Sequence, residues 1–237
     1  METKILGSNI KDFEQEGLYL VFPDTSRMIL TRDLIQKTTK EYWDDPEKIS
    51  PKAKTAAEFQ RCPFCPLKEN SLCDALRPVL PLLDKTDKYV SYDKVIAVYK
   101  RDISKLFYAC DTTMQEALKF ISILSLMQYC QIGRTYWKYY FGIVPLMSGD
   151  EMARRMYKNI FFLTKGNAVE TDKIITSFKG QIKITSTNQV KRLSLICKND
   201  AFMNAFVNTQ VVSELLSMNI AEHLKEKFDE FEKQIPR

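Results

Sequence analysis

The chain has 237 residues, of which 45% are hydrophobic, so it is long and apolar enough to bury a sizeable core, which excludes disorder of the whole chain. Its net charge of +5 is too weak to indicate nucleic-acid binding by itself. Residues 1–17 lack the apolar run and cleavage site of a signal peptide. The most apolar segment, residues 114–130, contains charged side chains that are costly in lipid. The sequence therefore predicts a cytoplasmic protein without membrane insertion.

The first half of the chain favours a small antiparallel sheet. Two β-prone runs separated by turn-forming Pro, Asp and Ser residues indicate a hairpin, and a second pair of strands follows later. Residues 32–61 are charged, poorly periodic and interrupted by Asp-Pro and Ser-Pro, which predicts mostly loop, held to the core by Trp43. Residues 74–83 predict a short helix that Pro78 and Pro81 interrupt or kink. The predicted strands are residues 18–22, 28–30, 95–99 and 103–110.

From residue 111 onward the apolar pattern becomes helical. Residues 114–130 have only a narrow polar stripe, which predicts a mostly buried central helix that stops near Gly133. Ser148-Gly-Asp-Glu151 indicates a capped helix start with acidic residues at its positive end. The other predicted helices are residues 134–144, 174–197, 200–218 and 222–233.

These patterns together predict an α+β protein. A small N-terminal antiparallel sheet with a cysteine metal knuckle is expected over residues 1–110, followed by a C-terminal α-helical bundle over residues 111–237. The two regions are expected to pack together as one unit, with the terminal helix docked onto the bundle.

The six cysteines do not favour a disulfide framework, because the cytoplasm keeps thiols reduced. The sharpest motif is Cys62-Pro-Phe-Cys65-Pro-Leu, because a Cys-x2-Cys turn lets two thiolates converge on one ion. Cys73 is the third candidate ligand. Spacing alone leaves the fourth ligand open among Cys110, Cys130, Cys197, His223 and an acidic side chain.

The same residues carry a resemblance. The pattern Cys-Pro-x-Cys-Pro-Leu-x5-Cys, followed by Ser91-Tyr-Asp-Lys-Val95, is similar to that of an uncharacterised bacterial family of unknown function. The similarity continues through residues 199–206. The resemblance implies that a lone cysteine fifteen residues before a proline, here Cys130 before Pro145, is the fourth ligand. It implies no activity.

The resemblance also implies histidines near these cysteines, which are replaced here by Gln60 and by Gln131-Ile132, so no histidine role is carried over. Four thiolates without an open position are typical of a structural zinc site rather than a hydrolytic one. An iron–sulfur cluster also takes four cysteines, but nothing else in the sequence indicates electron transfer, so zinc is the favoured cofactor. The alternative is that these cysteines are buried thiols that bind no metal. The turn-like sequence and the prolines that follow Cys62 and Cys65 argue against this alternative. We assign Cys110 and Cys197 to the core.

Enzyme templates find little support in this sequence. His223 is the only histidine and lies on the charged terminal segment, so no Ser-His-Asp set can form, and no glycine-rich phosphate loop occurs. The sequence therefore predicts a non-enzymatic, zinc-stabilised interaction or regulatory module with an unknown protein partner. One alternative is an iron–sulfur or thiol redox sensor.

A second alternative is a nucleic-acid-binding regulator that uses a basic and aromatic helical face. Its basic residues are Arg134, Lys138, Arg154, Arg155 and Lys158. We favour instead the interpretation that the aromatic side chains of residues 136–141 fill the bundle core while these basic residues are solvated.

Overall fold

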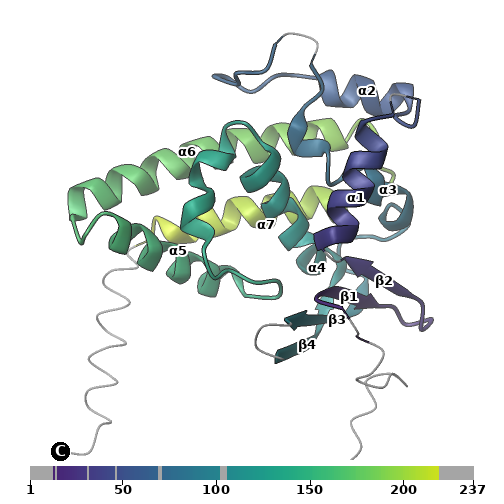
Figure 1. The fold of residues 1–237 in the computed structure, drawn as a ribbon, viewed down its shortest axis with the longest axis horizontal. Helices are drawn as coiled ribbons and strands as arrows, with labels where there is room; N and C mark the ends of the chain where they lie inside the picture. Colours follow the sequence, from purple (N-terminus) through teal and green to yellow (C-terminus); the bar gives the residue numbers. More distant parts are fainter. Residues whose placement is uncertain are drawn as a thin grey trace, which may run out of the picture.

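The computed structural model describes residue 13 and residues 15–30, 32–45, 47–68, 71–101 and 106–218. These residues form a small antiparallel sheet and a larger group of helices that lies beside it (Figure 1). The predicted mixed α+β class is confirmed at this level. The predicted terminal helix over residues 222–233, with His223, lies outside the described residues.

One antiparallel sheet holds the four strands, β1 (Gly17–Val21), β2 (Arg27–Leu30), β3 (Lys94–Arg101) and β4 (Leu106–Thr113). Their order in the sheet is β2-β1-β3-β4, so both predicted strand pairs are present. Leu20 of β1 lies opposite Met28 of β2 on one side and Ala97 of β3 on the other. All residues of β1 are buried, which agrees with its continuous apolar run.

The prediction of mostly loop over residues 32–61 was wrong. This stretch forms α1 (Arg32–Trp43) and α2 (Pro51–Glu58), and the short elements η2 (Asp74–Leu76) and α3 (Leu80–Thr86) follow. The Ser-Pro pair interpreted as a breaker starts α2, because the Ser50 hydroxyl accepts the Ala53 N–H and Pro51 occupies the first turn. The buried face of α2 consists of alanines, which give a weak hydrophobic signal. Trp43 does pack against the core, with the Arg77 guanidinium 5.2 Å from its ring centre.

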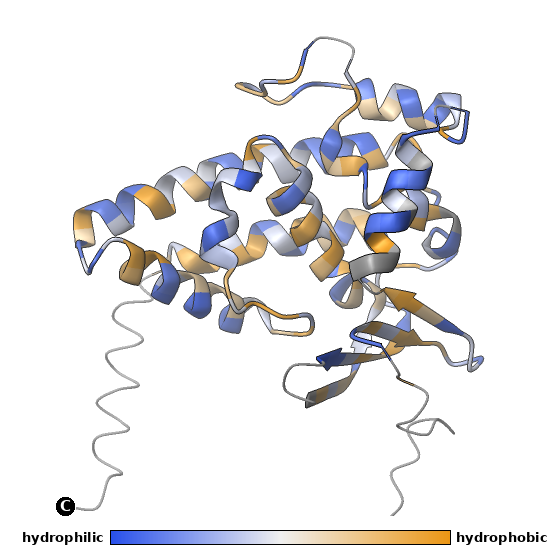
Figure 2. Cartoon of the chain, in the orientation of Figure 1, coloured by the Kyte–Doolittle hydropathy of each residue, from blue (hydrophilic) through white to orange (hydrophobic). Residues whose placement is uncertain are grey.

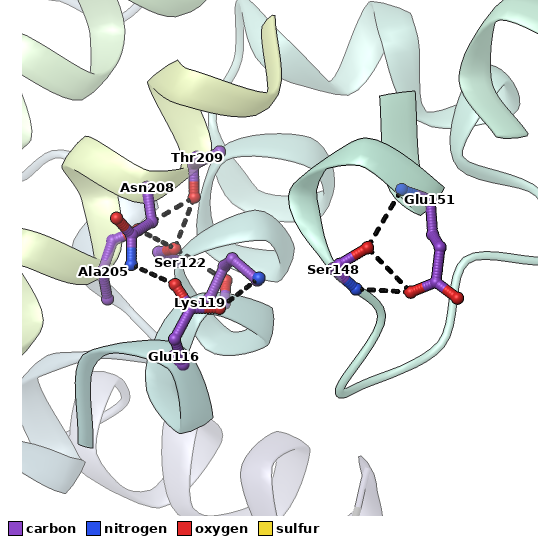
Figure 3. Close-up of polar contacts among 8 residues, drawn as sticks. All are labelled: Glu116, Lys119, Ser122, Ser148, Glu151, Ala205, Asn208 and Thr209. Carbon is purple, nitrogen blue, oxygen red and sulfur yellow. Dashed lines mark hydrogen bonds and ion pairs between the residues drawn. The ribbon is translucent and has the colours of Figure 1, made fainter. Parts of the chain in front are cut away.

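The second half of the described chain is helical, as predicted. Its elements are α4 (Met114–Leu124), the π-helical turn η3 (Ser125–Tyr129), the 3-10 segment η4 (Gly133–Tyr140), α5 (Gly149–Leu163), α6 (Ala168–Leu193) and α7 (Ala201–Leu216). Helix α7 packs against α4, α5 and α6 and so forms the centre of the group. The expected cap of α5 is confirmed, since Ser148 and Glu151 exchange hydrogen bonds (Figure 3).

Polar side chains join α4 to α7 within the core. The Ser122 hydroxyl donates to the Ala205 carbonyl oxygen at 2.9 Å and bonds to the Thr209 hydroxyl at 2.6 Å. Nearby, the Glu116 carboxylate accepts from Asn208 at 2.7 Å and pairs with the buried ammonium of Lys119 (Figure 3). These bonds satisfy groups that would otherwise be buried without partners.

The predicted central helix changes form before it ends. After α4 the chain widens into η3, and the side chain of Ser125 donates to the Ala75 carbonyl oxygen at 2.5 Å. A Cβ atom at Gly133 would overlap the backbone of Leu126, so only glycine allows η4 to start this close to η3. The aromatic segment that follows is a 3-10 helix, whereas the sequence indicated a helix without fixing its type.

A single large hydrophobic cluster draws on both the sheet and the helices. Figure 2 shows apolar and polar residues alternating along the helices, as expected when one face of each is buried. The expected boundary at residue 110 falls inside β4. Within the described part of the chain, no helix is both long and apolar enough to cross a membrane.

Candidate metal centre

The Cys-Pro-Phe-Cys motif forms a tight turn directly after α2. The Cys65 N–H donates to the Cys62 carbonyl oxygen at 3.1 Å, which closes a four-residue turn. Pro63 occupies the second position and Phe64 the third with φ of 64°, both features of a type II turn. The Phe64 side chain is 96% exposed, so the turn projects from the surface while Cys62 is buried beneath it. The local geometry is that expected of a Cys-x2-Cys knuckle.

Backbone hydrogen bonds fix Cys73 against α2 and Cys130 at the end of η3. The Cys73 N–H donates to the Ala57 carbonyl oxygen of α2 at 2.9 Å, and the Cys130 N–H donates to the Ser125 carbonyl oxygen at 3.0 Å. The Gln131 amide donates to the Asp74 carboxylate at 2.6 Å and ties the two segments together.

All four candidate cysteines line one small cavity of about 20 Å³. Such a volume suits a single water molecule or ion. Cys62 and Cys130 are buried, whereas Cys65 and Cys73 are partly exposed. In the arrangement that the described residues adopt, however, no three His, Cys, Asp or Glu side chains form a group that could hold a metal ion. The turn expected for the knuckle is present, but a metal-binding knuckle is not shown.

The other two cysteines lie elsewhere. Cys110 is exposed on β4, so its assignment to the core was wrong: it sits on a stretch of that strand that no described element covers. Cys197 packs partly buried against the core after the end of α6. Burial chiefly, with the Asp87 carboxylate second, raises the pKa of the Cys197 thiol to about 12. Neither residue lines the four-cysteine cavity.

Helix α6 supplies polar groups to the cavity that the sequence analysis missed. The Asn188 amide donates to the Cys62 sulfur at 3.2 Å, and the Gln189 amide donates to the Cys73 sulfur at 3.4 Å. The sequence signal that could have found them is the continuation, by polar residues at three- to four-residue spacing, of the apolar stripe that includes Phe178 and Ile182. These polar residues are Thr185, Asn188, Gln189 and Arg192.

Arg192, on the next turn of α6, is only 2% exposed and lines the same cavity. Its guanidinium donates to the carbonyl oxygens of Phe59 and Gln60, both at 2.8 Å, at the start of the knuckle. Its Nη1 atom and the Oε1 atom of Gln189 are buried without a hydrogen-bond partner. No carboxylate of the described residues forms an ion pair with it. The cavity therefore holds a buried guanidinium that forms no ion pair with a described residue, although two carboxylates also line the cavity: that of Asp74, which is paired with Arg77, and that of the exposed Glu58.

The pKa of the buried Cys130 thiol depends on its surroundings. Burial raises the pKa of Cys130 to about 11, and the neighbouring sulfurs of Cys73 and Cys62 act in the same direction. The backbone N–H groups of Gly133 and Ile132 oppose this effect by donating to the sulfur. Without a metal ion, this thiol stays protonated near neutral pH.

A separate apolar groove of about 560 Å³ lies between η4 and the end of α5. The side chains of Phe141 and Phe162 are 81% and 76% exposed there, and Leu163 is 56% exposed. The Asn159 amide donates to the carbonyl oxygens of Tyr139 and Phe141, both at 2.8 Å, and fixes η4 to α5. This groove is an exposed apolar surface of the kind that marks interaction sites.

The basic residues around this groove are not all free. Arg154 pairs with Asp150 on α5, and the Lys138 ammonium lies 5.1 Å from the ring centre of Tyr139. The interpretation of the aromatic side chains as core holds for three of them and fails for two, since Trp137 and Phe141 are exposed. The three buried residues are Tyr136, Tyr139 and Tyr140.

Comparison with known protein families found one family model that matches most of the chain. A family model described as a domain of unknown function, DUF6901, matches residues 20–232. The chain belongs to the DUF6901 family. No curated protein and no solved structure matches it. All four candidate cysteines and the polar residues of α6 lie inside the matched DUF6901 region.

Proposed function

We propose that this DUF6901 chain is a non-enzymatic interaction or regulatory module stabilised by one zinc ion. Its ligands are Cys62, Cys65, Cys73 and Cys130, which line a common cavity. Thiolates bind zinc at about 2.3 Å in a tetrahedral set, so side-chain rotations must bring the sulfurs inward. A closed set of four thiolates has no position for water, so the metal supplies stability rather than chemistry.

The observation that carries the proposal is the buried guanidinium of Arg192. No described carboxylate forms an ion pair with it, four neutral thiols supply no negative charge, and a buried charge without an ion-pair partner costs several kcal/mol. A zinc ion with four thiolates is a doubly negative centre, which supplies the missing counter-charge at the same cavity. A bond between the Arg192 Nη1 and Gln189 Oε1 atoms would satisfy both polar atoms but not the charge.

The amide donors of α6 support the same conclusion. Asn188 and Gln189 already donate N–H groups to two of the sulfurs. Hydrogen bonds to an ionised acceptor are roughly twice as strong as those to a neutral one. Such outer-shell donors orient metal ligands and tune their charge. The polar side of α6 is therefore suited to thiolates rather than thiols.

Elemental analysis of protein purified without chelator tests the metal directly. We expect about one zinc ion per chain, lost in Cys130→Ser and retained in the matched Cys197→Ser variant. Chelation should lower the melting temperature of the wild type strongly, because structural zinc contributes about 10–16 kcal/mol of apparent binding free energy. If the purified protein instead contains iron and absorbs visible light, the cysteines hold an iron–sulfur cluster and the redox alternative is favoured. Metal-free, fully folded wild type, or full zinc in Cys130→Ser, would contradict the proposed ligand set.

The proposed interaction with a partner protein takes place at the groove between η4 and α5. Exposed Phe141 and Phe162 provide apolar contacts, while Lys138, Arg155 and Lys158 are exposed near them. We propose a protein segment with apolar side chains flanked by acidic residues as the partner. The apolar lining favours a protein over nucleic acid, and the pairing of Arg154 with Asp150 weakens the basic face further.

Affinity purification from the native cell with matched variants tests this partner. A protein recovered with the wild type should be lost with Phe162→Ser and retained with Tyr92→Ser, because Tyr92 is also highly exposed but lies outside the groove. The recovered protein should contain an acidic, apolar segment that binds as a synthetic peptide. Recovery of RNA or DNA whose binding falls steeply with salt would favour the nucleic-acid alternative instead. Equal recovery with both variants would remove the groove from the interaction.

A further inference from the structure

A second cavity lies between the sheet and the π-helical turn, and it is separate from the four-cysteine cavity. Its volume is about 160 Å³, and its lining comes from β1, β2, α1, β3, α4, η3, η4 and the loop after η4. The lining is largely apolar and rich in aromatic rings, and it also includes the polar residues Gln36 and Gln128 and the carboxylate of Glu16, which acts electrostatically on the Tyr99 hydroxyl. The main contributors are Leu18, Tyr99, Phe120, Leu124, Tyr129 and Trp137.

The size of this cavity limits what can occupy it. An apolar cavity of about 150 Å³ stays free of water and accommodates one benzene molecule. At about 160 Å³, this cavity has room for one six-membered ring and a small substituent. The cavity is partly open to solvent, since Glu16, Gln36 and Trp137 in its lining are exposed, and a ring that packs against the apolar walls displaces water from them.

A few polar atoms at the cavity are free to bind such a substituent. The side-chain amide of Gln128 and the hydroxyls of Tyr99 and Tyr129 make no hydrogen bond with any described residue. Tyr99 is 8% exposed, and burial chiefly raises the pKa of its hydroxyl, so this group stays a neutral donor. Apolar walls with a few unpaired polar groups are typical of small-molecule sites.

The π-helical turn explains why these polar groups are here. Within the turn, Leu126 and Met127 are fully buried, while Gln128 and Tyr129 line the cavity. Ser125 joins the turn to the Ala75 carbonyl oxygen, and Gly133, which has no Cβ, allows the following chain to pass close to the Leu126 backbone. Single π-helical turns are rare and occur frequently at functional sites.

We infer that this cavity is a binding site for a small molecule with a single aromatic ring and one polar substituent. The ring packs among the aromatic and leucine side chains, and the substituent bonds to Gln128 or a tyrosine hydroxyl. The inference does not depend on the metal ion, because the lining residues and the four cysteines form separate cavities.

Fluorine NMR of the full chain with 4-fluorophenol as the probe tests this inference. We expect saturable, one-to-one binding, with intermolecular contacts from the probe to Tyr99 and Leu18. Leu124→Phe fills the cavity and should abolish binding, whereas the matched Leu195→Phe, outside the cavity, should not.

A second variant, which removes a polar group from the cavity, tests the inference if Leu124→Phe does not fold. Gln128→Leu should weaken binding of 4-fluorophenol by about tenfold, the loss of one hydrogen bond, and leave binding of fluorobenzene unchanged. Absence of saturable binding to the wild type would overturn the inference. Contacts of the probe with Phe162 instead of Tyr99 would also overturn it, because they would locate binding in the groove between η4 and α5.

Discussion

Replacing Arg192 by methionine separates its structural role from its role as a counter-charge. The guanidinium makes two hydrogen bonds of 2.8 Å to the carbonyl oxygens of Phe59 and Gln60. Hydrogen bonds to a charged group contribute about 1.5–3 kcal/mol each, so their loss destabilises the protein in every state. In the zinc-bound protein the substitution also removes the partner of the thiolates, and breaking a buried charge pair costs about 3–5 kcal/mol.

The zinc-free protein responds differently, because there the substitution also removes an uncompensated buried charge. That relief offsets part of the lost hydrogen bonding, so we expect a smaller destabilisation than in the zinc-bound protein. A difference of at least about 1.4 kcal/mol between the two states corresponds to at least a tenfold loss of zinc affinity, by reciprocity of the coupling. Arg192→Lys should fall between, since it keeps the charge without the two-pronged geometry.

Urea unfolding with zinc and with chelator measures the two destabilisations, and competition with a chromophoric chelator measures zinc affinity independently. The two routes must give the same coupling free energy. Equal destabilisation with and without zinc, together with unchanged zinc affinity, would refute the assignment of Arg192 as the counter-charge.

Three further predictions concern the scaffold. Ser148→Ala removes the hydroxyl that accepts the Glu151 N–H and should cost about 1 kcal/mol at neutral pH. The Ser148 N–H and hydroxyl lower the pKa of Glu151, so their bonds to the carboxylate stabilise the protein above the ordinary carboxyl pKa and are lost as the pH falls through the lowered value. The difference in melting temperature between wild type and variant should therefore narrow in acid, and the part due to the bond with the Glu151 N–H should remain. Gly133→Ala should destabilise because its Cβ overlaps the Leu126 backbone, whereas Gly180→Ala on α6, where the Cβ meets open space, should stabilise by about 0.5–1 kcal/mol in urea unfolding. Glu116→Leu should destabilise more than Lys119→Met in the same assay, because it leaves a buried ammonium without its partner; the reverse order would contradict that account.

The sequence by itself determined the elements whose signals are local. The first hairpin followed from apolar runs around a turn, and the start of α5 followed from Ser148 and Glu151, because a capping box involves only neighbouring residues. The Cys-x2-Cys turn is of the same kind, since Pro63 and the backbone of Phe64 set it without help from distant segments. Residues 51–58 show the limit of local signals. Their buried face is made of alanines, and a serine-proline pair can either interrupt a helix or begin one.

Only the tertiary structure decided which distant residues share the cysteine cavity. Cys130 lines it because a π-helical turn redirects the chain after α4, and a one-sequence pattern cannot distinguish that turn from a regular helix end. Arg192 reaches the knuckle because α2 packs against α6, and nothing in the sequence near either helix encodes that contact. Side-chain periodicity indicates which face of a helix is buried, whereas the neighbour that covers it is decided by the packing of the whole core.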